Sequence, residues 1–195
     1  MIDNKPYSQA CENNKSFILA HLKEAFSSAT HVLEIGSGTG QHAVYFAPAL
    51  PHLIWQTSDQ APYHAGINQW IDDFPSDNLR RPLLFKVAEN VTLFDDFDAI
   101  FTANTAHIMQ KEDVEIMMGL IANHLPKGGV FCQYGPFTDR GVFTSESNQQ
   151  FHLHLLEQGY GGYRDINELI EWSQGLKLAQ NICMPANNQL LIWRK

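Results

Sequence analysis

Three glycines at alternate positions, directly after a short apolar run, constrain this chain more than any other feature. Residues 31–35 read HVLEI, which predicts a buried strand, and Gly36, Gly38 and Gly40 precede a segment with helical spacing. Glycine lets a backbone turn tightly and lets a ligand approach without a Cβ atom in the way. In open α/β sheets, the turn from the first strand into a helix is a common ligand site. The pattern therefore predicts a ligand-binding loop, with a tight turn that holds no ligand as the alternative.

The rest of the chain alternates between predicted strands and helices. Strands are expected over residues 31–35, 53–59, 83–88, 98–103, 129–135, 176–185 and 188–195, and helices over residues 8–26, 41–50, 64–74, 111–125, 147–158 and 166–175. This alternation predicts a Rossmann-like, doubly wound α/β fold, with a mostly parallel seven-stranded sheet and helices on both faces. The final connection, MPANN, is too short for a parallel crossover, so the last strand should run antiparallel to its neighbour.

Composition limits the partners. The chain has 195 residues, and a chain of this length can bury roughly 70% of its unfolded surface. We expect residues 1–195 to form one domain, with the leading helix of residues 1–28 packed over the ligand side of the sheet. The net charge is −8 and no run of Lys or Arg is present, so nucleic acid is not an expected partner. No apolar stretch approaches the roughly 18 residues of a membrane span, and the N-terminus lacks the apolar core of a secretion signal. The expected location is cytoplasmic, without a membrane partner.

Neither cysteine nor histidine follows a metal-binding pattern. The cysteines, Cys11, Cys132 and Cys183, are scattered and form no Cys-x-x-Cys pair. His152 and His154 are two positions apart on a predicted helix and so point to different faces. The other histidines show no ligand spacing, and no metal is expected.

The spacing of the glycines separates the possible ligands. A P-loop needs a lysine after the glycines, and none is near. A dinucleotide fingerprint counted from Gly36 meets Gln41 at its third glycine. Counted from Gly38 it meets Ala43, an allowed variant, so NAD remains an alternative.

An acidic residue at the end of the second predicted strand points to a ribose. Asp59 lies 19 residues after Gly40, near the roughly 20-residue offset at which such folds place a carboxylate on ribose hydroxyls. A carboxylate there accepts both hydroxyl protons and disfavours a 2′-phosphate. A helix cap or turn residue is the alternative role of Asp59.

The stretch Glu34-x-Gly36-x-Gly38-x-Gly40 resembles the first motif of class I S-adenosylmethionine (SAM)-dependent methyltransferases, in which an acidic residue precedes the first glycine by two positions. Over nearly its whole length the chain also resembles the methyltransferase-like family called domain of unknown function 938. The matching stretches are ENNKSFIL, VLEIGSGTGQHAVYFA, LPHLIWQTSD, NTAHI, YGPF, SNQQF, GYRD and MPANN. The resemblance implies SAM as cofactor and methyl transfer to a small-molecule acceptor.

Three sets of residues are predicted to form the site. The cofactor set is Glu34, Gly36, Ser37, Gly38, Thr39, Gly40, His42, Asp59, Gln60, Ala88, Glu89 and Asn104. The catalytic set is His107 as a base, whose ordinary pKa lies near neutrality, with Asn104 and Tyr134 orienting the acceptor. The substrate set is Asn14, Tyr134, Asn148 and Arg164.

Each of these roles has an alternative. His107 could cap the following helix, Tyr134 could only pack, and Arg164 could pair with Asp165 at the surface. Asn187 and Asn188 are expected to serve the final turn.

The chain departs from the family's pattern at several positions. Asn13-Asn14 stand where Arg-Asn is usual in the family. Lys86 stands where an acidic residue often follows the apolar run of the third strand. After Phe151, the family tends to have an Asp and, further on, arginines, whereas this chain has His152, Leu156 and Glu157. If these positions line the acceptor pocket, the acceptor differs from that of relatives. Two other functions stay open: a non-catalytic SAM-binding protein that acts through a partner, and an NAD-dependent oxidoreductase. The acceptor and the oligomeric state do not follow from the sequence.

Overall fold

The computed structural model describes residues 5–87, 89, 94 and 96–195. The strands of its large sheet are β1 (His31–Ile35), β2 (Ile54–Asp59), β3 (Leu79–Leu84), β4 (Ala99–Ala103), β5 (Val130–Gly135), β8 (Lys177–Met184) and β9 (Asn188–Arg194). The α-helices are α1 (Gln9–Ala25), α2 (Gln41–Ala49), α3 (His64–Asp73), α4 (Lys111–His124), α5 (Glu146–Glu157) and α6 (Ile166–Trp172). Two short strands, β6 (Phe137–Thr138) and β7 (Arg164–Asp165), pair in parallel apart from this sheet, and the 3-10 turns are η1 (Ala61–Tyr63) and η3 (Pro185–Asn187).

The sheet has the order β3-β2-β1-β4-β5-β9-β8. The first five of these strands are parallel, and β9 is antiparallel to both β5 and β8. The predicted Rossmann-like fold and its antiparallel last strand are therefore confirmed. The strand order reverses between β1 and β4, which is where such sheets open a crevice at the carboxyl ends of their strands.

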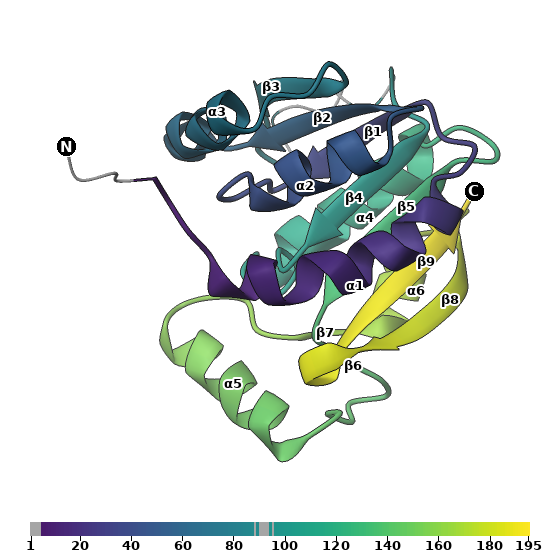
Figure 1. Ribbon diagram of the computed structural model, residues 1–195. Helices are drawn as coiled ribbons and strands as arrows, with labels where there is room; N and C mark the ends of the chain where they lie inside the picture. The colour runs from purple at the N-terminus through teal and green to yellow at the C-terminus, as the bar shows by residue number, and fades with distance from the viewer. Residues whose placement is uncertain (1–4, 88, 90–93, 95) are drawn as a thin grey trace.

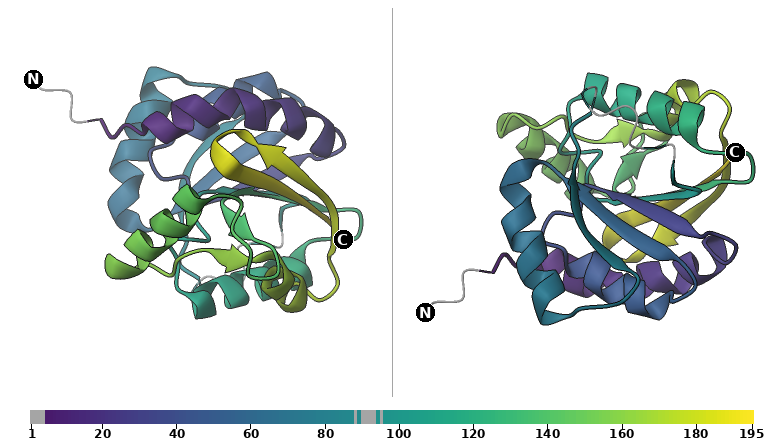
Figure 2. Two further views of the ribbon diagram at one scale, coloured as in Figure 1. Left: turned by 90° about the horizontal axis from the view of Figure 1, so that it is seen from below. Right: turned by 90° about the horizontal axis from the view of Figure 1, so that it is seen from above.

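Helices cover both faces of the sheet (Figures 1 and 2). Alternate residues along each central strand enter opposite cores, so that Val32 packs with α1, α2 and α3, and Leu33 packs with α4 and α6. In β4, Phe101 and Ile100 divide in the same way. Burial on both faces explains why these strands read as continuous apolar runs.

The third predicted strand is wrong in position. It was expected over residues 83–88, whereas β3 covers Leu79–Leu84. β3 lies at the sheet edge with mostly exposed side chains, so its sequence lacks an apolar pattern. Pro82 sits where the register with β2 shifts, a position in which proline is tolerated because no ladder hydrogen bond is lost. The apolar residue that suggested a strand, Phe85, is buried just beyond β3 against the α4 side.

The helix boundaries agree with the predictions to within one residue, with one exception. The helix expected over residues 166–175 ends at Trp172. Asp165 begins it with a capping box, in which the Asp165 side chain and that of Glu168 each accept a backbone N–H. Gly175, with a φ of 100°, lies in the turn that leads to β8.

Candidate functional site

A cavity of about 700 Å³ opens at the carboxyl ends of β1, β2, β4 and β5. The first turn of α1, the loop after β4, one side of α5 and the hairpin between β8 and β9 complete its wall. The cavity therefore lies at the point where the strand order reverses, and residues from both ends of the sequence reach it.

The glycine loop forms the floor of the cavity. Gly36 and Gly38 line it with φ angles of 71° and 57°. A Cβ atom on Gly36 would lie 2.5 Å from Thr105 Cγ2, whereas one on Gly38 would meet no atom within 4 Å. Gly36 thus permits close packing of the loop on the β4–α4 connection, and Gly38 leaves backbone open to a ligand. Ser37 and Thr39 also line the cavity, but Gly40 does not and instead packs on α3 next to Ile67.

Asp59 fastens the end of β2 to this loop. Its Oδ2 accepts a hydrogen bond of 2.7 Å from the Gly38 N–H, and its Oδ1 accepts one of 2.7 Å from the Gln60 N–H. Both Asp59 and Gln60 line the cavity. Burial raises the pKa of Asp59 above its ordinary value, against the lowering effect of these two N–H groups. Each carboxylate oxygen retains acceptor capacity for a ligand hydroxyl.

Glu34 lies beneath the loop and does not line the cavity, which corrects its predicted contact with a cofactor. Its Oε2 accepts hydrogen bonds from Ser37 Oγ at 2.9 Å and from Trp55 Nε1 at 3.1 Å. Ser37 Oγ in turn accepts a bond from the Ser58 N–H at 3.1 Å. Burial raises the pKa of Glu34 to about 7. Glu34 therefore supports the shape of the loop.

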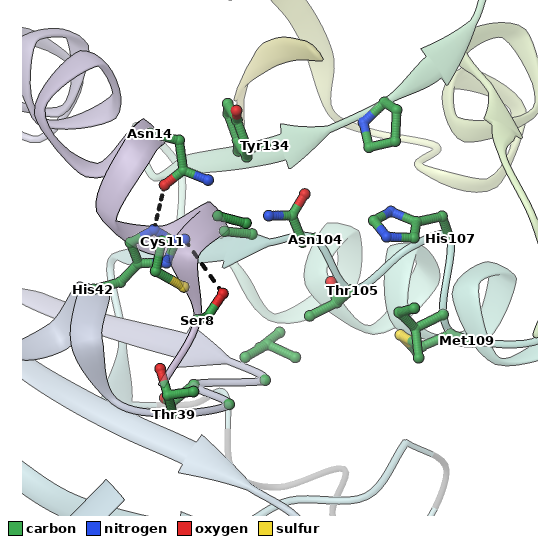
Figure 3. Close-up of a pocket in the computed structure, with 18 of the residues that line it drawn as sticks. Ser8, Cys11, Asn14, Thr39, His42, Asn104, Thr105, His107, Met109 and Tyr134 are labelled. Atoms are coloured by element: carbon green, nitrogen blue, oxygen red, sulfur yellow. Dashed lines mark hydrogen bonds between the residues drawn. The ribbon is translucent and has the colours of Figure 1, made fainter. Parts of the chain in front are cut away.

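The N-terminal helix is attached to the residues that follow the glycine loop. The Ser8 N–H donates to Gln41 Oε1 at 2.6 Å, and Gln41 Nε2 donates to Glu12 Oε1 at 2.7 Å. His42 Nε2 donates to Asn14 Oδ1 at 2.7 Å (Figure 3). Asn14 and His42 both line the cavity, and burial lowers the pKa of His42 to about 4, so its ring is neutral at pH 7.

Asn104 directly follows β4 in a strained conformation. Its φ is 57°, a left-handed value that non-glycine residues rarely adopt, and its N–H donates to the Tyr134 carbonyl at 2.9 Å. Residues held in this region at a cost of roughly 1–3 kcal/mol concentrate at functional sites. Asn104 lines the cavity, and its contacts with cofactor and acceptor stay predictions.

Tyr134 and His107 both reach the cavity. Burial raises the pKa of Tyr134, while hydrogen bonds with the Asn14 and Asn188 side chains act in the opposite direction. Burial alone lowers the pKa of His107 to about 4. At pH 7 the His107 ring is therefore neutral and has a lone pair with which to accept a proton.

Asn148 and Arg164 were both predicted to meet the acceptor, and the structure separates them. Asn148 lines the cavity, and its Nδ2 donates to Thr144 Oγ1 at 2.7 Å and to the Asn187 carbonyl at 3.0 Å, which joins α5 to the hairpin. Arg164 is buried outside the cavity lining. Its guanidinium donates to the carbonyls of Gly161 and Gly162. The prediction that Arg164 meets an anionic acceptor is wrong in this geometry.

The alternative partner of Arg164 is engaged elsewhere. Asp165 accepts hydrogen bonds from Thr138 Oγ1 at 2.8 Å and from the N–H groups of Gly141 and Asn167. These bonds outweigh burial and lower the pKa of Asp165 to about 2. Arg164 and Asp165 therefore do not form the predicted surface ion pair, and each instead hydrogen-bonds groups in and around β6 and β7.

The adenine-side prediction is only partly described. Ala88 lies outside the described residues. Glu89 is exposed, is not among the residues that line the cavity, and pairs with Lys86 at 2.6 Å. Phe85, Lys86 and Val87 line this end of the cavity instead.

Comparison with known families assigns the chain to one of them. The model of the family described as a protein of unknown function, DUF938, matches residues 5–195. The chain belongs to this family.

Solved structures with the same fold include O-methyltransferases, to which this DUF938 protein is similar. A putative O-methyltransferase from Nostoc punctiforme matches with a TM-score of 0.80 at 16% identity, over 95% of this chain and 56% of that one. An O-methyltransferase family 2 protein from Planctomyces limnophilus, in complex with apigenin, matches with a TM-score of 0.75 at 16% identity, over 93% and 61%. Human N-acetylserotonin methyltransferase, in complex with SAM, matches with a TM-score of 0.73 at 14% identity, over 95% and 58%. This DUF938 chain thus spans less than two thirds of each of these proteins, and at such identities the likeness concerns the fold.

Several cavity residues of this DUF938 protein were not predicted. They include Ser8, Cys11, Tyr63, Thr105, Met109, Phe151, Tyr163 and Asn188. Asn188 was assigned to the turn, and its Nδ2 does donate to the Pro185 and Ala186 carbonyls there; its place in the cavity wall was not predicted. Phe151 lies three positions after Asn148, so helical spacing places it beside a residue that was already predicted to meet the acceptor, and this was a usable signal for the wall.

Within residues 5–87, 89, 94 and 96–195, no group of three or more His, Cys, Asp or Glu side chains could hold a metal ion. Over the same residues, no helix has both the length and the apolar content that crossing a membrane requires.

Proposed function

We propose that this protein binds SAM and transfers its methyl group to a small-molecule acceptor. The observation that carries the proposal is the hydrogen bond of 2.7 Å from the Gly38 N–H to Asp59 Oδ2, at the carboxyl ends of β1 and β2. It joins a backbone left open at Gly38 to a carboxylate with free acceptor capacity. The neighbouring structures that hold SAM or a flavone in the same fold support the same reading.

The residues present suit such a cofactor. Gly36, Ser37 and Gly38 would lie under its methionyl and ribose parts, and Asp59 would accept its ribose hydroxyls. When bound, this cofactor supplies an activated methyl group on a sulfonium. The cavity of about 700 Å³ lies within the roughly 300–1,000 Å³ that small-molecule sites occupy.

The chain's own part in the reaction is alignment and proton transfer. Asn104 and Tyr134 border the space beyond the glycine loop, so they can fix an acceptor in line with the methyl group. Alignment of this kind contributes up to roughly 7–11 kcal/mol to rate acceleration in favourable cases. His107, neutral at pH 7, can accept the proton that an acceptor O–H or N–H gives up.

The other two functions have weaker support. A non-catalytic SAM-binding protein would have a closed acceptor pocket, whereas this cavity continues past Asn104 to His107 and Tyr163. An NAD-dependent oxidoreductase shares the ribose carboxylate at Asp59 but needs a hydride-relay group that the sequence does not suggest.

Calorimetric titration with SAM, S-adenosylhomocysteine and NAD tests the proposal. We expect micromolar binding of the first two to the wild-type protein and loss of that binding in Asp59→Ala. Asp139→Ala is the matched control, because Asp139 is an exposed carboxylate outside the cavity lining. Binding of NAD alone, or equal weakening by both substitutions, would overturn the proposal.

A further inference from the structure

Charge is distributed unevenly around the cavity. Among the described residues that line it, Asp59 and Lys86 are the two that carry a formal charge at pH 7. Asp59 ends β2 and Lys86 follows β3, both on one side of β1, and Lys86 is paired with Glu89. The opposite side, where β4, β5 and the β8–β9 hairpin end, contributes uncharged residues to the lining. The half of the cavity beyond Asn104 is called the acceptor half below.

Aromatic rings form one wall of the acceptor half. The ring centroids of His107 and Phe151 are 6.1 Å apart, those of His107 and Tyr163 are 6.3 Å apart, and those of Phe151 and Tyr163 are 6.2 Å apart. Phe151 is 44% exposed, although it faces the cavity from α5. A large ring left open at a cavity rim is the surface that a flat apolar ligand would cover.

Three neutral amides are among the polar groups of the acceptor half, beside the Tyr134 hydroxyl and the His107 ring. Asn104, Asn148 and Asn188 line it, and Figure 3 shows Asn104 in the same part of the cavity as Tyr134 and His107. Amides donate and accept hydrogen bonds with hydroxyl groups but do not compensate a full charge. The buried His107 ring is itself neutral at pH 7.

An arginine adjacent in sequence to this wall bonds only backbone carbonyls in the described contacts. Arg164 directly follows Tyr163, but its guanidinium donates to the Gly161 and Gly162 carbonyls and lies outside the cavity lining. It therefore does not offer a cation to a ligand carboxylate. Burial of an unpaired charge is costly, so this half of the cavity disfavours ionised acceptors of either sign.

We propose that the acceptor is an uncharged aromatic compound that carries a hydroxyl group, with its ring against Phe151 and Tyr163 and its hydroxyl toward His107. This inference rests on the proposed function, which it makes more specific. In the transfer, the hydroxyl oxygen forms the new bond to the methyl carbon as the carbon–sulfur bond breaks, and that bond's electron pair stays on sulfur. The hydroxyl proton passes to the His107 ring and from there to solvent. The positive charge of the sulfonium is thus replaced by that of the protonated His107 ring and leaves with the proton, so charge balances at each step.

A matched set of ligands separates charge from shape. The protein saturated with S-adenosylhomocysteine is titrated with naphthol, naphthoate, naphthylmethylammonium and decahydronaphthol. We expect naphthol to bind at least about tenfold more tightly than either ion, because the ions lose hydration without a partner. We also expect the saturated alcohol to bind more weakly than naphthol, because it cannot stack on the rings.

Two pairs of variants place the ligand. Phe151→Ala should weaken naphthol binding by at least about fivefold, whereas Leu153→Ala, an exposed residue on the same helix outside the cavity lining, should leave it unchanged. Ala186→Lys adds a cation at the rim, on an exposed residue, and should strengthen naphthoate binding selectively.

The outcomes distinguish this inference from the proposed function. Failure of S-adenosylhomocysteine to bind the wild-type protein overturns the proposed function and the inference with it. If it binds but naphthoate or the ammonium compound binds as tightly as naphthol, the neutral-acceptor inference is overturned while the proposed function stands. Equal binding of decahydronaphthol, or no effect of Phe151→Ala, overturns the aromatic part.

Discussion

The Gly38 N–H donates a hydrogen bond of 2.7 Å to Asp59 Oδ2, so one contact joins the glycine loop to the end of β2. A ligand that hydrogen-bonds to the carboxylate therefore also acts on the loop. Because Gly38 faces open space and Gly36 faces Thr105, the loop has a ligand side and a packing side.

Because the two sides of the loop differ, Gly36→Ala and Gly38→Ala should lower the free energy of unfolding by different amounts. Both residues have a positive φ, which costs a non-glycine residue about 1–2 kcal/mol. Gly36→Ala also places its Cβ 2.5 Å from Thr105 Cγ2, so we expect it to lower the free energy of unfolding by at least about 1 kcal/mol more than Gly38→Ala does. Chemical denaturation of both variants measures this, and equal losses would contradict the packing role of Gly36.

A second prediction concerns Glu34 and pH. Burial raises its pKa to about 7 from the ordinary 4.5, so the folded protein holds a proton that the unfolded chain has released. The Glu34 contribution to stability is therefore full below pH 4.5 and declines as the pH rises to about 7, by about 3 kcal/mol in all.

The measurement for Glu34 is a difference at each pH. Glu34→Gln removes the titration, so this variant should gain stability relative to the wild type between pH 5 and pH 8. Direct comparison is necessary because His42 and His107, with lowered pKa values, change the stability of both proteins in the opposite direction. A difference that stays constant with pH would show that Glu34 is ionised in the folded state.

His107 supplies a third prediction. Its pKa of about 4 means that the ring is neutral throughout the pH range from 6 to 8, where an ordinary histidine titrates. Its ring C–H signals in NMR spectra should stay constant from pH 8 down to about 5.5 and move below that. With a compound that the wild-type protein methylates, His107→Gln should lower kcat by roughly 10²-fold, with little change in affinity for S-adenosylhomocysteine. Titration near pH 6.5 would refute the buried neutral ring.

Asn104 allows backbone strain to be separated from side-chain function. Asn104→Gly relieves the φ of 57° and should match or exceed wild-type stability, whereas Asn104→Ala keeps the strain without the amide and should lose about 1 kcal/mol. Both variants remove the amide, so both should weaken acceptor or cofactor binding. Wild-type binding by Asn104→Gly would assign the residue a purely conformational role.

A further prediction is that Arg164 contributes to stability and not to ligand recognition. Arg164→Met leaves the carbonyls of Gly161 and Gly162 without their donors, so we expect a loss of about 1–3 kcal/mol in the free energy of unfolding. Because the guanidinium lies outside the cavity lining, the preference among neutral and charged ligands should persist. A shift of that preference would place Arg164 in the acceptor site after all.

The sequence predicted the parts of the site that depend on local pattern. The glycine loop follows β1, and Asp59 ends β2. Both strands are largely buried, so each appears in the sequence as an apolar run whose end is easy to locate. Strand β3 was misplaced because an edge strand with one solvated face has no such run.

The acceptor wall was the least predictable part. Phe151 and Tyr163 belong to the segment between β5 and α6, which folds back over the crevice through contacts that no short motif encodes. Arg164 was misassigned because its partners are the carbonyls of its own loop, and a charged residue in a sequence suggests charged partners first. Asn188 was expected only in the turn, where its side chain does bond the Pro185 and Ala186 carbonyls; its second role in the cavity wall depends on the approach of β5 and α5, which are distant in sequence.

Tyr134 is bonded by Asn14 from α1 and by Asn188 from the final hairpin, two residues with most of the chain between them. Closing so long a loop has an entropic cost that must be met by contacts formed earlier. On a ribosome, where the chain emerges from its N-terminus, the sheet core of β1 to β5 can assemble before β9 leaves the exit tunnel. This crevice then gains its last wall at the end of synthesis, so the nascent protein passes through a stage that has a glycine loop but no finished pocket.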